Sequence, residues 1–443
     1  MANQYQNGST FLKAGDYVMD LLEIRSLVSQ KSLDLRGLVK KVEVYEDLFS
    51  PYLTAKLYIE DSFNFPEKLP ITGQEVVDIR FKSDINDFKP VSASFRVYKL
   101  DNHKIGDSSK SQTYTLHLMS VGGYLNYSQF CGYSLKGSTS KMVQTIFEKH
   151  FPDSVWKDRL FIEPSMENYS LVIPGSHTPF KAINWLTSRA FTERGQNYSP
   201  YYFYETLDGY CYKSLTGIME DGFLQRQRYT YMPPNLALTE DQVDTVPFAT
   251  ALPPRYHKIL GLEDLERFDM AANISHGVVS SRLVVHDLVR KQQRYSEFFE
   301  GDVFETKPKM GTQPLFKEEK GDANTVLKTG AAFYYLPSTP YTVYNRTNSV
   351  IDNFQYEETF LKHRHHTGTM LTHKLAMLAY GESRRRVGDV ATIDITRIQS
   401  DGFLDPSVSD KNLGGNYMIT SVRHDFSTAY TCKYELSKTC MGV

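Results

Sequence analysis

The side chains best suited to metal chemistry form a histidine run late in the sequence, KHRHHTGTMLTH. The run contains His363, His365, His366 and His373. If a helix expected over residues 367–380 extended back into this run, His366 and His373 would stack two turns apart with His363 nearby, an arrangement that suits zinc or nickel. However, no carboxylate or thiol stands at ligand spacing, and basic residues flank the run. The pattern therefore favours a solvated or interface-forming face, and His363, His366 and His373 are the only candidate metal ligands.

Other reactive residues form no catalytic pattern. The chain has no glycine-rich phosphate or dinucleotide loop, no paired-histidine zinc-protease motif and no serine-hydrolase elbow. Ser176 and His177 are adjacent in sequence, which does not by itself make the geometry of a triad. The arginines from Arg384 to Arg386 could contact a phosphate, but they follow the end of the expected helix, where cations are favourable in any case. Scattered pairs of acidic residues would be compatible with a glycosidase, but no pair stands out from the others. We therefore expect no catalytic residue and no cofactor.

Composition limits the classes of function to be considered. The 443 residues are enough for about three domains. Lys and Arg total 50 against 52 Asp and Glu, so the chain lacks an overall basic surface for nucleic acid. The 30 tyrosines and 26 phenylalanines suit β-structure and interfaces. We therefore expect no specific nucleic-acid recognition.

The cysteines and the N-terminus predict a soluble protein made in a cytoplasm. Cys131, Cys211, Cys432 and Cys440 are widely spaced and form no Cys-x-x-Cys pair, which argues against a zinc ribbon or a disulfide framework. The N-terminal stretch lacks a basic segment followed by an apolar core, and no apolar stretch approaches membrane-spanning length. We expect buried or incidental thiols and no membrane insertion.

A β-hairpin is the clearest structural pattern, in the stretch KKVEVYEDLFSPYLTAKLYIEDS. Apolar residues alternate with polar ones before the turn, beginning at Val42, and after it, ending at Ile59. The turn contains Ser-Pro, but it also carries two large apolar residues, Leu48 and Phe49, followed by Tyr52. One interpretation is an ordinary sheet edge with an apolar loop. The other is a loop that contacts a neighbouring subunit, with Leu48, Phe49 and Tyr52 as interface candidates.

Further strands and helices are expected along the rest of the chain. Strands are expected at 75–81, 92–100, 112–120, within 200–219 around an Asp208-Gly209 turn, within 276–295, and in the C-terminal stretches VGDVATIDI and NYMITSVRHDFSTAYTCKYELSK. Helices are expected at 138–151, 178–195 and 367–380. Residues 221–254 and 301–353 show little periodicity and predict long loops.

Several of these stretches, in order, resemble the baseplate central hub protein of contractile-tailed bacteriophages. That family is also similar to the N-terminal part of type VI secretion spike proteins. The matching stretches are VEVYEDLFSPYLTAKLYIEDS, PFKAINWLTSRAF, YYFYETLDGYCYKSL, GVVSSRLVVHDLVRK, RRVGDVATIDI and GNYMITSVRHDFSTAYTCKYEL. They span most of the chain, and their order and spacing together are more specific than any one of them. Residues 221–254 and 301–353 match no part of this pattern.

The resemblance implies a mainly β (α+β) fold with two antiparallel β-barrel domains like those of tail tubes, and with inserted helical and loop domains. The expected boundaries are 1–130 for the first barrel, 131–198 for a helical insertion, 199–300 for the first part of the second barrel with a loop insertion at 221–272, 301–365 for a long loop segment, and 366–443 for the helix and strands that complete the second barrel.

The resemblance also implies a homotrimer, because two barrels in each of three chains give a ring of six that can join a threefold spike to a sixfold tube. The expected function is a non-enzymatic baseplate hub in the tail of the virion, which helps form the channel for genome ejection. The expected partners are the central spike protein, tail-tube or tube-initiator proteins, the tape-measure protein and baseplate wedge proteins. A hub of a type VI secretion system or phage-like injection particle is a variant of this hypothesis. The alternative class is a cell-wall-degrading tail enzyme of the lysozyme or peptidase type.

Overall fold

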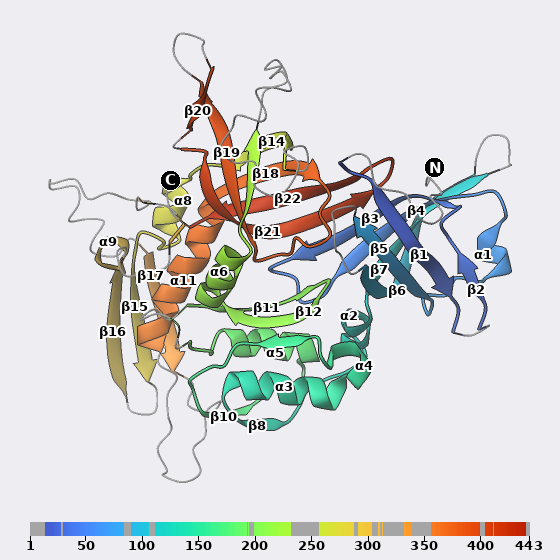
Figure 1. The fold of residues 1–443 in the computed structure, drawn as a ribbon. Helices are drawn as coiled ribbons and strands as arrows, with labels where there is room; N and C mark the ends of the chain where they lie inside the picture. Colours follow the sequence, from blue (N-terminus) through green and yellow to red (C-terminus); the bar gives the residue numbers. More distant parts are fainter. Residues whose placement is uncertain are drawn as a thin grey trace.

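The structure is a computed structural model, and it describes residues 14–27, 30–83, 90–105, 111–192, 194, 199–231, 257–287, 291–303, 309–310, 312, 332–338, 356–398, 404–410 and 412–439. These residues form a mainly β protein, as expected, with helices gathered around one extended and mostly antiparallel sheet (Figure 1). Within the described residues, no helix combines the length and apolar character needed to cross a bilayer.

The first unit of the sheet is built from the N-terminal strands, drawn in blue to teal in Figure 1. Its strands are β1 (Tyr17–Arg25), β3 (Val39–Asp47), β4 (Thr54–Asp61), β5 (Val76–Ser83), β6 (Val91–Ile105) and β7 (Gln112–Ser120). They lie in the order β1-β5-β6-β7-β4-β3. The short β2 (Ser32–Asp34) pairs with β1 and leads into β3, and α1 (Phe65–Lys68) connects β4 to β5.

The predicted hairpin is confirmed as β3 and β4. Val42 pairs with Leu57 and Val44 with Ala55, and all four side chains are buried. This burial is the physical cause of the alternation, because successive residues of a strand point to opposite faces of the sheet. The strands expected at 75–81, 92–100 and 112–120 are confirmed as β5, β6 and β7.

The second unit uses strands from the C-terminal half of the chain. They are β13 (Gln227–Tyr231), β14 (Ile259–Glu266), β18 (His373–Tyr380), β19 (Val390–Ile398), β21 (Gly415–Phe426) and β22 (Tyr430–Lys438). They lie in the order β13-β19-β21-β22-β18-β14, and β20 (Leu404–Ser409) is added beside β19. The three C-terminal strands expected from the sequence are confirmed as β19, β21 and β22.

The two units repeat one strand order. When the six strands of each unit are numbered by their appearance along the chain, both units run first, fourth, fifth, sixth, third, second. One direction differs, because β1 is antiparallel to β5 whereas β13 is parallel to β19. The fold therefore contains a structural duplication.

The units correspond to the two expected barrels, but neither is closed by a complete ladder of hydrogen bonds within the described residues. In the second unit, β13 meets the start of β14 through a single bridge between Thr230 and Lys258. In the first unit, β1 approaches β3 only through β2.

A joint between β3 and β21 connects the two units edge to edge. Residues 42–47 of β3 pair antiparallel with residues 421–426 of β21. A single hydrophobic core runs through both units, and it includes Leu57 of the first and Leu436 of the second, both fully buried. The two units therefore fold against each other as one body.

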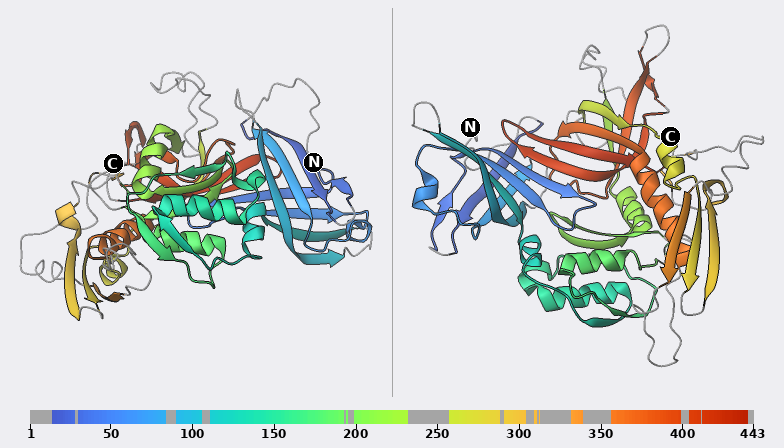
Figure 2. Two further views of the ribbon diagram at one scale, coloured as in Figure 1. Left: turned by 90° about the horizontal axis from the view of Figure 1, so that it is seen from below. Right: turned by 180° about the vertical axis from the view of Figure 1, so that it is seen from behind.

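A helical insertion with its own hydrophobic core follows the first unit. It comprises α2 (Val121–Asn126), β8 (Ser134–Gly137), α3 (Thr139–His150), α4 (Asp153–Trp156), β9 (Leu160–Ile162), β10 (Tyr169–Val172), α5 (Pro179–Thr187), β11 (Tyr201–Thr206), β12 (Gly209–Ser214) and α6 (Leu215–Leu224). Figure 1 and the right view of Figure 2 show most of it below the joint, with α6, β11 and β12 nearest the sheet. The helix expected at 138–151 and the hairpin at Asp208-Gly209 are confirmed.

The helix expected at 178–195 is shorter than predicted, since α5 ends at Thr187. Arg189 donates to the carbonyl oxygen of Trp185, and the chain then leaves the helical path. The amide of Phe191 donates instead to the carboxylate of Glu167, so a tertiary contact ends the helix.

A third group of elements lies between β14 and β18. It comprises α8 (Met270–Ser275), β15 (Ser280–Asp287), β16 (Gln292–Phe299), α9 (Glu300–Val303), β17 (Ala332–Ser338) and α11 (Tyr356–Thr372). Strands β16, β15 and β17 form a separate sheet that packs on α11. In the first unit the equivalent connection, from β3 to β4, is only the hairpin tip at residues 48–53. We call the group between β14 and β18 the inserted subdomain.

The helix expected at 367–380 is wrong in its position. Helix α11 ends at Thr372, and residues 373–380 are strand β18, which lies between β14 and β22. Leu375, Met377 and Ala379 alternate into the core and are fully buried. Leu371, Leu375 and Leu378 have helical spacing, which led to the prediction of a helix. In the folded chain, residues 373–380 instead form a strand whose alternate side chains pack in the core.

Candidate functional site

A cleft of about 860 Å³ lies between the tip of the β3–β4 hairpin, the end of α5, β11 and α11. Its lining includes Leu48, Phe49, Arg189, Tyr202, His363 and Arg364. The structure thus brings together residues that the sequence suggested for two different purposes. Leu48 and Phe49 were interface candidates, and His363 was a candidate metal ligand.

The three residues of the hairpin tip have different environments. Leu48 is fully buried, and its amide donates to the carbonyl of Thr420, so this side chain belongs to the core and offers no surface to a partner. Phe49 is 47% exposed and meets Tyr202 edge to face, with ring centroids 5.9 Å apart. Tyr52 is half-buried, and its hydroxyl lies 2.8 Å from that of Tyr127. Phe49 is therefore the most accessible apolar group of the tip.

The histidines do not converge on one point. His365 is buried, with Nδ1 2.6 Å from the carbonyl oxygen of Val278. His373 starts β18 rather than continuing α11, so the stacking of His366 and His373 on one helix does not occur. Burial lowers the pKa of His373 to about 4. Among the described residues, no group of three histidine, cysteine, aspartate or glutamate side chains is placed to hold a metal ion.

Arginines lie over aromatic rings around the cleft. The Arg364 guanidinium is 4.7 Å from the ring centroid of Tyr334, and that of Arg189 is 3.8 Å from Trp185. Exposed aromatics with arginine are enriched at protein interfaces. The chemistry of the cleft therefore suits binding of a protein surface better than a covalent reaction.

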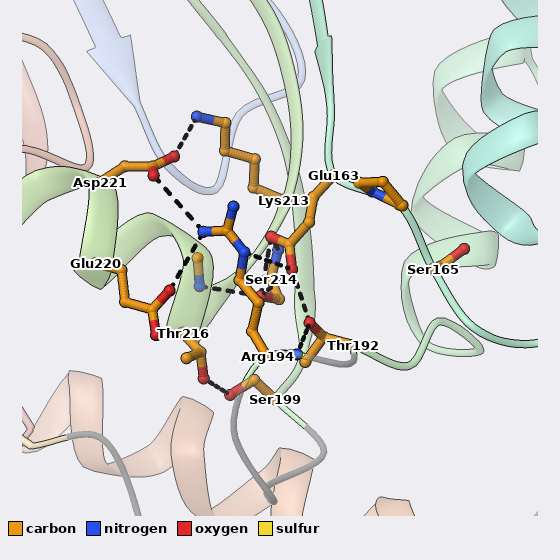
Figure 3. Close-up of polar contacts among 12 residues, drawn as sticks. Glu163, Ser165, Thr192, Arg194, Ser199, Lys213, Ser214, Thr216, Glu220 and Asp221 are labelled. Atoms are coloured by element: carbon orange, nitrogen blue, oxygen red, sulfur yellow. Dashed lines mark hydrogen bonds and ion pairs between the residues drawn. The ribbon is translucent and has the colours of Figure 1, made fainter.

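Glu163 is the centre of a second polar group, in the helical insertion (Figure 3). Its carboxylate accepts hydrogen bonds from the Ser214 amide at 2.9 Å and from the Thr192 hydroxyl at 2.7 Å. Around it, Arg194 pairs with Glu220 and Lys213 with Asp221. A hollow of about 410 Å³ is lined by this group. Because these charges bind one another, we assign the group a structural role at the start of α6.

A third polar group lies at the joint between the two units, and all its members except Asp208 are buried. The Arg386 guanidinium makes two hydrogen bonds of 2.9 Å to Asp208, and its Nε lies 4.0 Å from the fully buried Glu46. Asp208 is at the turn of β11 and β12, so this contact also ties the helical insertion to the joint. The expected position of the arginines from Arg384 to Arg386 just after a helix end is wrong, because strand β18 precedes them, and Arg386 is almost fully buried.

His424 and Cys432 complete the buried group. Nδ1 of His424 lies 3.3 Å from the Cys432 sulfur, and Nε2 lies 3.4 Å from Glu46. Burial opposes protonation of His424, but Cys432 and Glu46 outweigh it and raise its pKa to about 9. Both side chains are fully buried, which leaves no path for a substrate. Sequence reasoning missed this group because its members come from β3, β21, β22 and two separate loops.

The thiols are placed as the sequence predicts where they are described. Cys131, Cys211 and Cys432 are all free and buried. Cys440 lies outside the described residues.

Comparison with known proteins identifies the fold. No model of a protein family matches the sequence, and no curated protein matches it. Among solved structures, the chain is similar to a tail protein from Neisseria meningitidis, with a TM-score of 0.52 and 9% sequence identity over 96% of this chain and 98% of that chain. It is equally similar to a prophage MuSo2 tail protein from Shewanella oneidensis, with a TM-score of 0.52 and 7% identity over 96% of this chain and 98% of that chain. The chain therefore has the fold of these two tail proteins along nearly its whole length.

Proposed function

We propose that this chain is the structural hub of a phage-tail baseplate and acts as a homotrimer that joins a threefold spike to a sixfold tube. The observation that carries the proposal is the repeat of one strand order in two units that are joined edge to edge. Three such chains would supply six equivalent units, and head-to-tail contacts of this kind close into a ring when the rotation permits. The fold shared with two tail proteins supports a place in the tail of a virion.

In the proposed assembly, the ring encloses the channel for genome ejection. The central spike binds one side, tail-tube or tube-initiator proteins bind the other, the tape-measure protein passes through, and wedge proteins surround the ring. The cleft beside Phe49 is the proposed contact for one of these proteins, because its lining offers an exposed aromatic ring and two arginines. Tyr52 is proposed to support the tip from the side of Tyr127.

The proposal is tested by the solution mass of the purified chain and by electron microscopy of its particles. We expect a mass of three copies and a ring that looks sixfold at low resolution, with affinity for a spike or tube protein from the same particle. A chain that stays monomeric at high concentration and binds neither partner would rule the proposal out.

A non-enzymatic role is part of the proposal, and it has its own test. We expect no clearing of peptidoglycan by the purified chain in a zymogram. Clearing that is lost when His363, His366 and His373 are changed to Ala would instead establish the cell-wall-degrading alternative.

A further inference from the structure

We infer that the cleft beside Phe49 binds an acidic segment of a partner protein, in which carboxylates flank an apolar side chain. The inference rests on the proposed function only for the source of the segment, which is one of the proteins proposed to surround the hub. The chemistry of the segment is argued from the charges and the aromatic rings that line the cleft.

The cleft lies where three parts of the fold meet. The β3–β4 hairpin contributes its tip, the helical insertion contributes the end of α5 and the start of β11, and the inserted subdomain contributes α11. Figure 1 shows α11 between the sheet of β15–β17 and the helical insertion. The volume of about 860 Å³ suits a few residues of a segment, since ligand sites span roughly 300–1,000 Å³. A segment bound there would contact all three parts.

The lining of the cleft carries an excess of positive charge. Apart from two histidines, the charged residues among the described lining residues are Arg189, Arg364, Lys374 and Glu266. The Lys374 Nζ lies 3.7 Å from the Glu266 carboxylate, so these two charges offset each other. The two arginines supply the excess. Charge complementarity therefore favours a segment that carries carboxylates.

Arg364 is the main anion-binding group of the cleft. The residue is exposed, and its guanidinium lies 4.7 Å from the ring centroid of Tyr334 and 5.8 Å from that of Phe360. No described carboxylate forms an ion pair with it. Stacking on rings uses the flat face of a guanidinium, and the N–H groups in its plane can donate two parallel hydrogen bonds to a carboxylate. Arg364 can therefore bind an acidic side chain without giving up its present contacts.

The rings beneath Arg364 are fixed by contacts of their own. The Tyr334 hydroxyl donates to the carbonyl oxygen of His276 at 2.7 Å. Tyr334 and Phe360 meet edge to face, with ring centroids 5.4 Å apart. Phe360 and Arg364 are one turn apart on α11, so the helix sets their spacing. The guanidinium is therefore held in place before a partner binds, which lowers the entropic cost of binding.

Arg189 adds positive charge on the side of the helical insertion. Its guanidinium lies 3.8 Å from the ring centroid of Trp185, and Nη1 donates to the Trp185 carbonyl oxygen at 2.8 Å. Part of its charge thus stabilises the end of α5, where helix carbonyl groups favour cations. We therefore assign Arg189 a supporting role in binding, secondary to that of Arg364.

Phe49 provides the apolar contact of the cleft. Its ring is 47% exposed and meets Tyr202 edge to face, with ring centroids 5.9 Å apart. Tyr202 in turn contacts α11, because its hydroxyl lies 3.3 Å from that of Thr367. A supported ring with one accessible side buries apolar surface when a partner covers it. We therefore expect an apolar side chain between the carboxylates of the bound segment.

A nucleic acid fits the cleft less well than an acidic segment. Single strands bind along a groove whose cations follow successive phosphates. The described lining has three Lys and Arg side chains, and one of them is offset by Glu266. An oligonucleotide is therefore the competing ligand in the test.

The test is fluorescence anisotropy with the purified full chain. The probes are a short labelled peptide in which glutamates flank a central phenylalanine, the same peptide with lysine in place of every glutamate, and an oligothymidylate of similar length. We expect saturable binding of the acidic peptide alone, and its affinity should fall as salt is added. Equal binding of the lysine peptide, tighter binding of the oligonucleotide, or no binding of the acidic peptide would overturn the inference.

The variant Arg364→Glu should weaken binding of the acidic peptide at least about tenfold, because a hydrogen bond between charged groups is replaced by a repulsion. Arg80→Glu is the matched control, since it makes the same change of net charge at an exposed residue of β5 that does not line the cleft. Both variants should keep the circular dichroism spectrum of the natural protein. Equal affinities of the two variants would contradict the role of Arg364.

A second pair of variants tests the apolar contact on a different element. Phe49→Ala should weaken binding of the acidic peptide several-fold. Phe130→Ala is the control, because Phe130 is 64% exposed and does not line the cleft, and its affinity should match that of the natural protein. An unchanged affinity in Phe49→Ala would overturn the apolar part of the inference.

The source of the segment is tested with overlapping peptides that cover the proposed partner proteins of the same particle and this chain itself. We expect the strongest binder to be an acidic peptide of a partner protein, and its binding to be lost in Arg364→Glu. A strongest binder from this chain would indicate a second copy as the occupant and overturn the inference.

The outcomes for the cleft and for the proposed function are distinguishable. A trimer that binds a spike or tube protein but no acidic peptide would overturn the inference and leave the hub in place. A monomer that binds the acidic peptide through Arg364, and binds neither partner protein, would support the chemistry of the cleft and overturn the hub.

Discussion

Glu163 is the residue on which the polar contacts of the helical insertion converge. Its replacement by Ala leaves the Ser214 amide, the Ser214 hydroxyl and the Thr192 hydroxyl without their acceptor. We expect a loss of about 3 kcal/mol in the free energy of unfolding, since unsatisfied buried donors cost roughly 1–3 kcal/mol each. Chemical denaturation measures this loss.

Glu220→Ala is the matched control for that change. The Glu220 side chain is 57% exposed and pairs with Arg194 at the surface, so its loss should change stability by less than about 1 kcal/mol. Equal losses for the two variants would contradict the structural role assigned to Glu163.

Glu205 gives the stability a dependence on pH. This β11 residue is buried and accepts hydrogen bonds from the Leu53 amide and the Ser120 hydroxyl, which tie the helical insertion to the tip of the β3–β4 hairpin and to the end of β7. Burial raises its pKa from 4.5 to about 7, despite these hydrogen bonds. A raised pKa means that the folded state holds the proton more tightly, so this contribution is complete below pH 4.5 and is lost as the pH rises through about 7.

The variant Glu205→Gln removes the titration and keeps an acceptor oxygen. We expect the stability of the natural protein to fall relative to the variant by up to about 3 kcal/mol between pH 5 and pH 8. Urea denaturation of both proteins across this range measures the difference. Two parallel stability curves would show that Glu205 does not titrate there.

Single residues show where sequence reasoning reaches its limit. The sequence gives Arg384 and Arg386 the same local context, yet one side chain is 51% exposed and the other is 10% exposed. Their difference depends on Asp208 and Glu46, which are remote in sequence and meet Arg386 only after folding. Phe49 was identifiable as unusual because a large apolar residue in a turn has no local purpose. The sequence did not distinguish Leu48 from Phe49, because only the structure shows that the Leu48 side chain is buried.

At the level of elements, hydrophobic periodicity predicted the strands and helices that bury one face along their whole length. It did not predict elements whose pattern is interrupted or ambiguous. The hairpin of β3 and β4 and helix α3 were predictable, because one face of each is buried along its whole length. Strand β14 was missed because register shifts at Leu260 and Leu265 interrupt its alternation. Strand β18 was predicted as helix because leucines three and four residues apart coincide with an alternating pattern.

The turn between β11 and β12 is an element whose geometry needs glycine. Gly209 has a φ of 147°, and a Cβ atom there would lie 2.1 Å from the carbonyl oxygen of Arg159. We expect Gly209→Ala to cost about 3 kcal/mol in thermal or chemical unfolding, since neither backbone can move without breaking the sheet. Gly37→Ala is the control, because its Cβ would meet nothing within 4 Å, and it should change stability by less than about 0.5 kcal/mol. A similar cost at both sites would contradict the close approach at Arg159.

At the level of the whole molecule, the joint depends on Arg386. In the variant Arg386→Met, Glu46 stays buried without its guanidinium, and Asp208 no longer holds the helical insertion. We expect a loss below the roughly 3–5 kcal/mol of a broken buried ion pair, because the Asp208 side chain is 59% exposed and His424 still lies 3.4 Å from Glu46. We also expect faster hydrogen exchange of the amides in β3 and β21, which mass spectrometry of peptides can measure. Arg384→Met should leave both stability and exchange nearly unchanged, and a protected joint in Arg386→Met would contradict this role.

The duplication itself could not be read from the sequence. Val97 of β6 and Ile419 of β21 stand at matching register shifts in the fifth strand of each unit, yet they share only apolar character, which any buried strand position has. Strand order and register, which exist only in the folded chain, carry the evidence. The β-rich character and the order of the matching stretches could be predicted from the sequence. The joint between β3 and β21 could not.

The unequal connection between the second and third strands of the two units has a consequence for symmetry. This connection is a short hairpin tip in the first unit and the inserted subdomain in the second. The two units therefore differ here, although they share one strand order. In a ring of three chains, the six units would follow a sixfold pattern. The inserted subdomain, however, would be present on only every second unit. This alternation is possible because two units are joined in one polypeptide and can differ from each other. Six identical single-unit chains would either all carry the subdomain or all lack it.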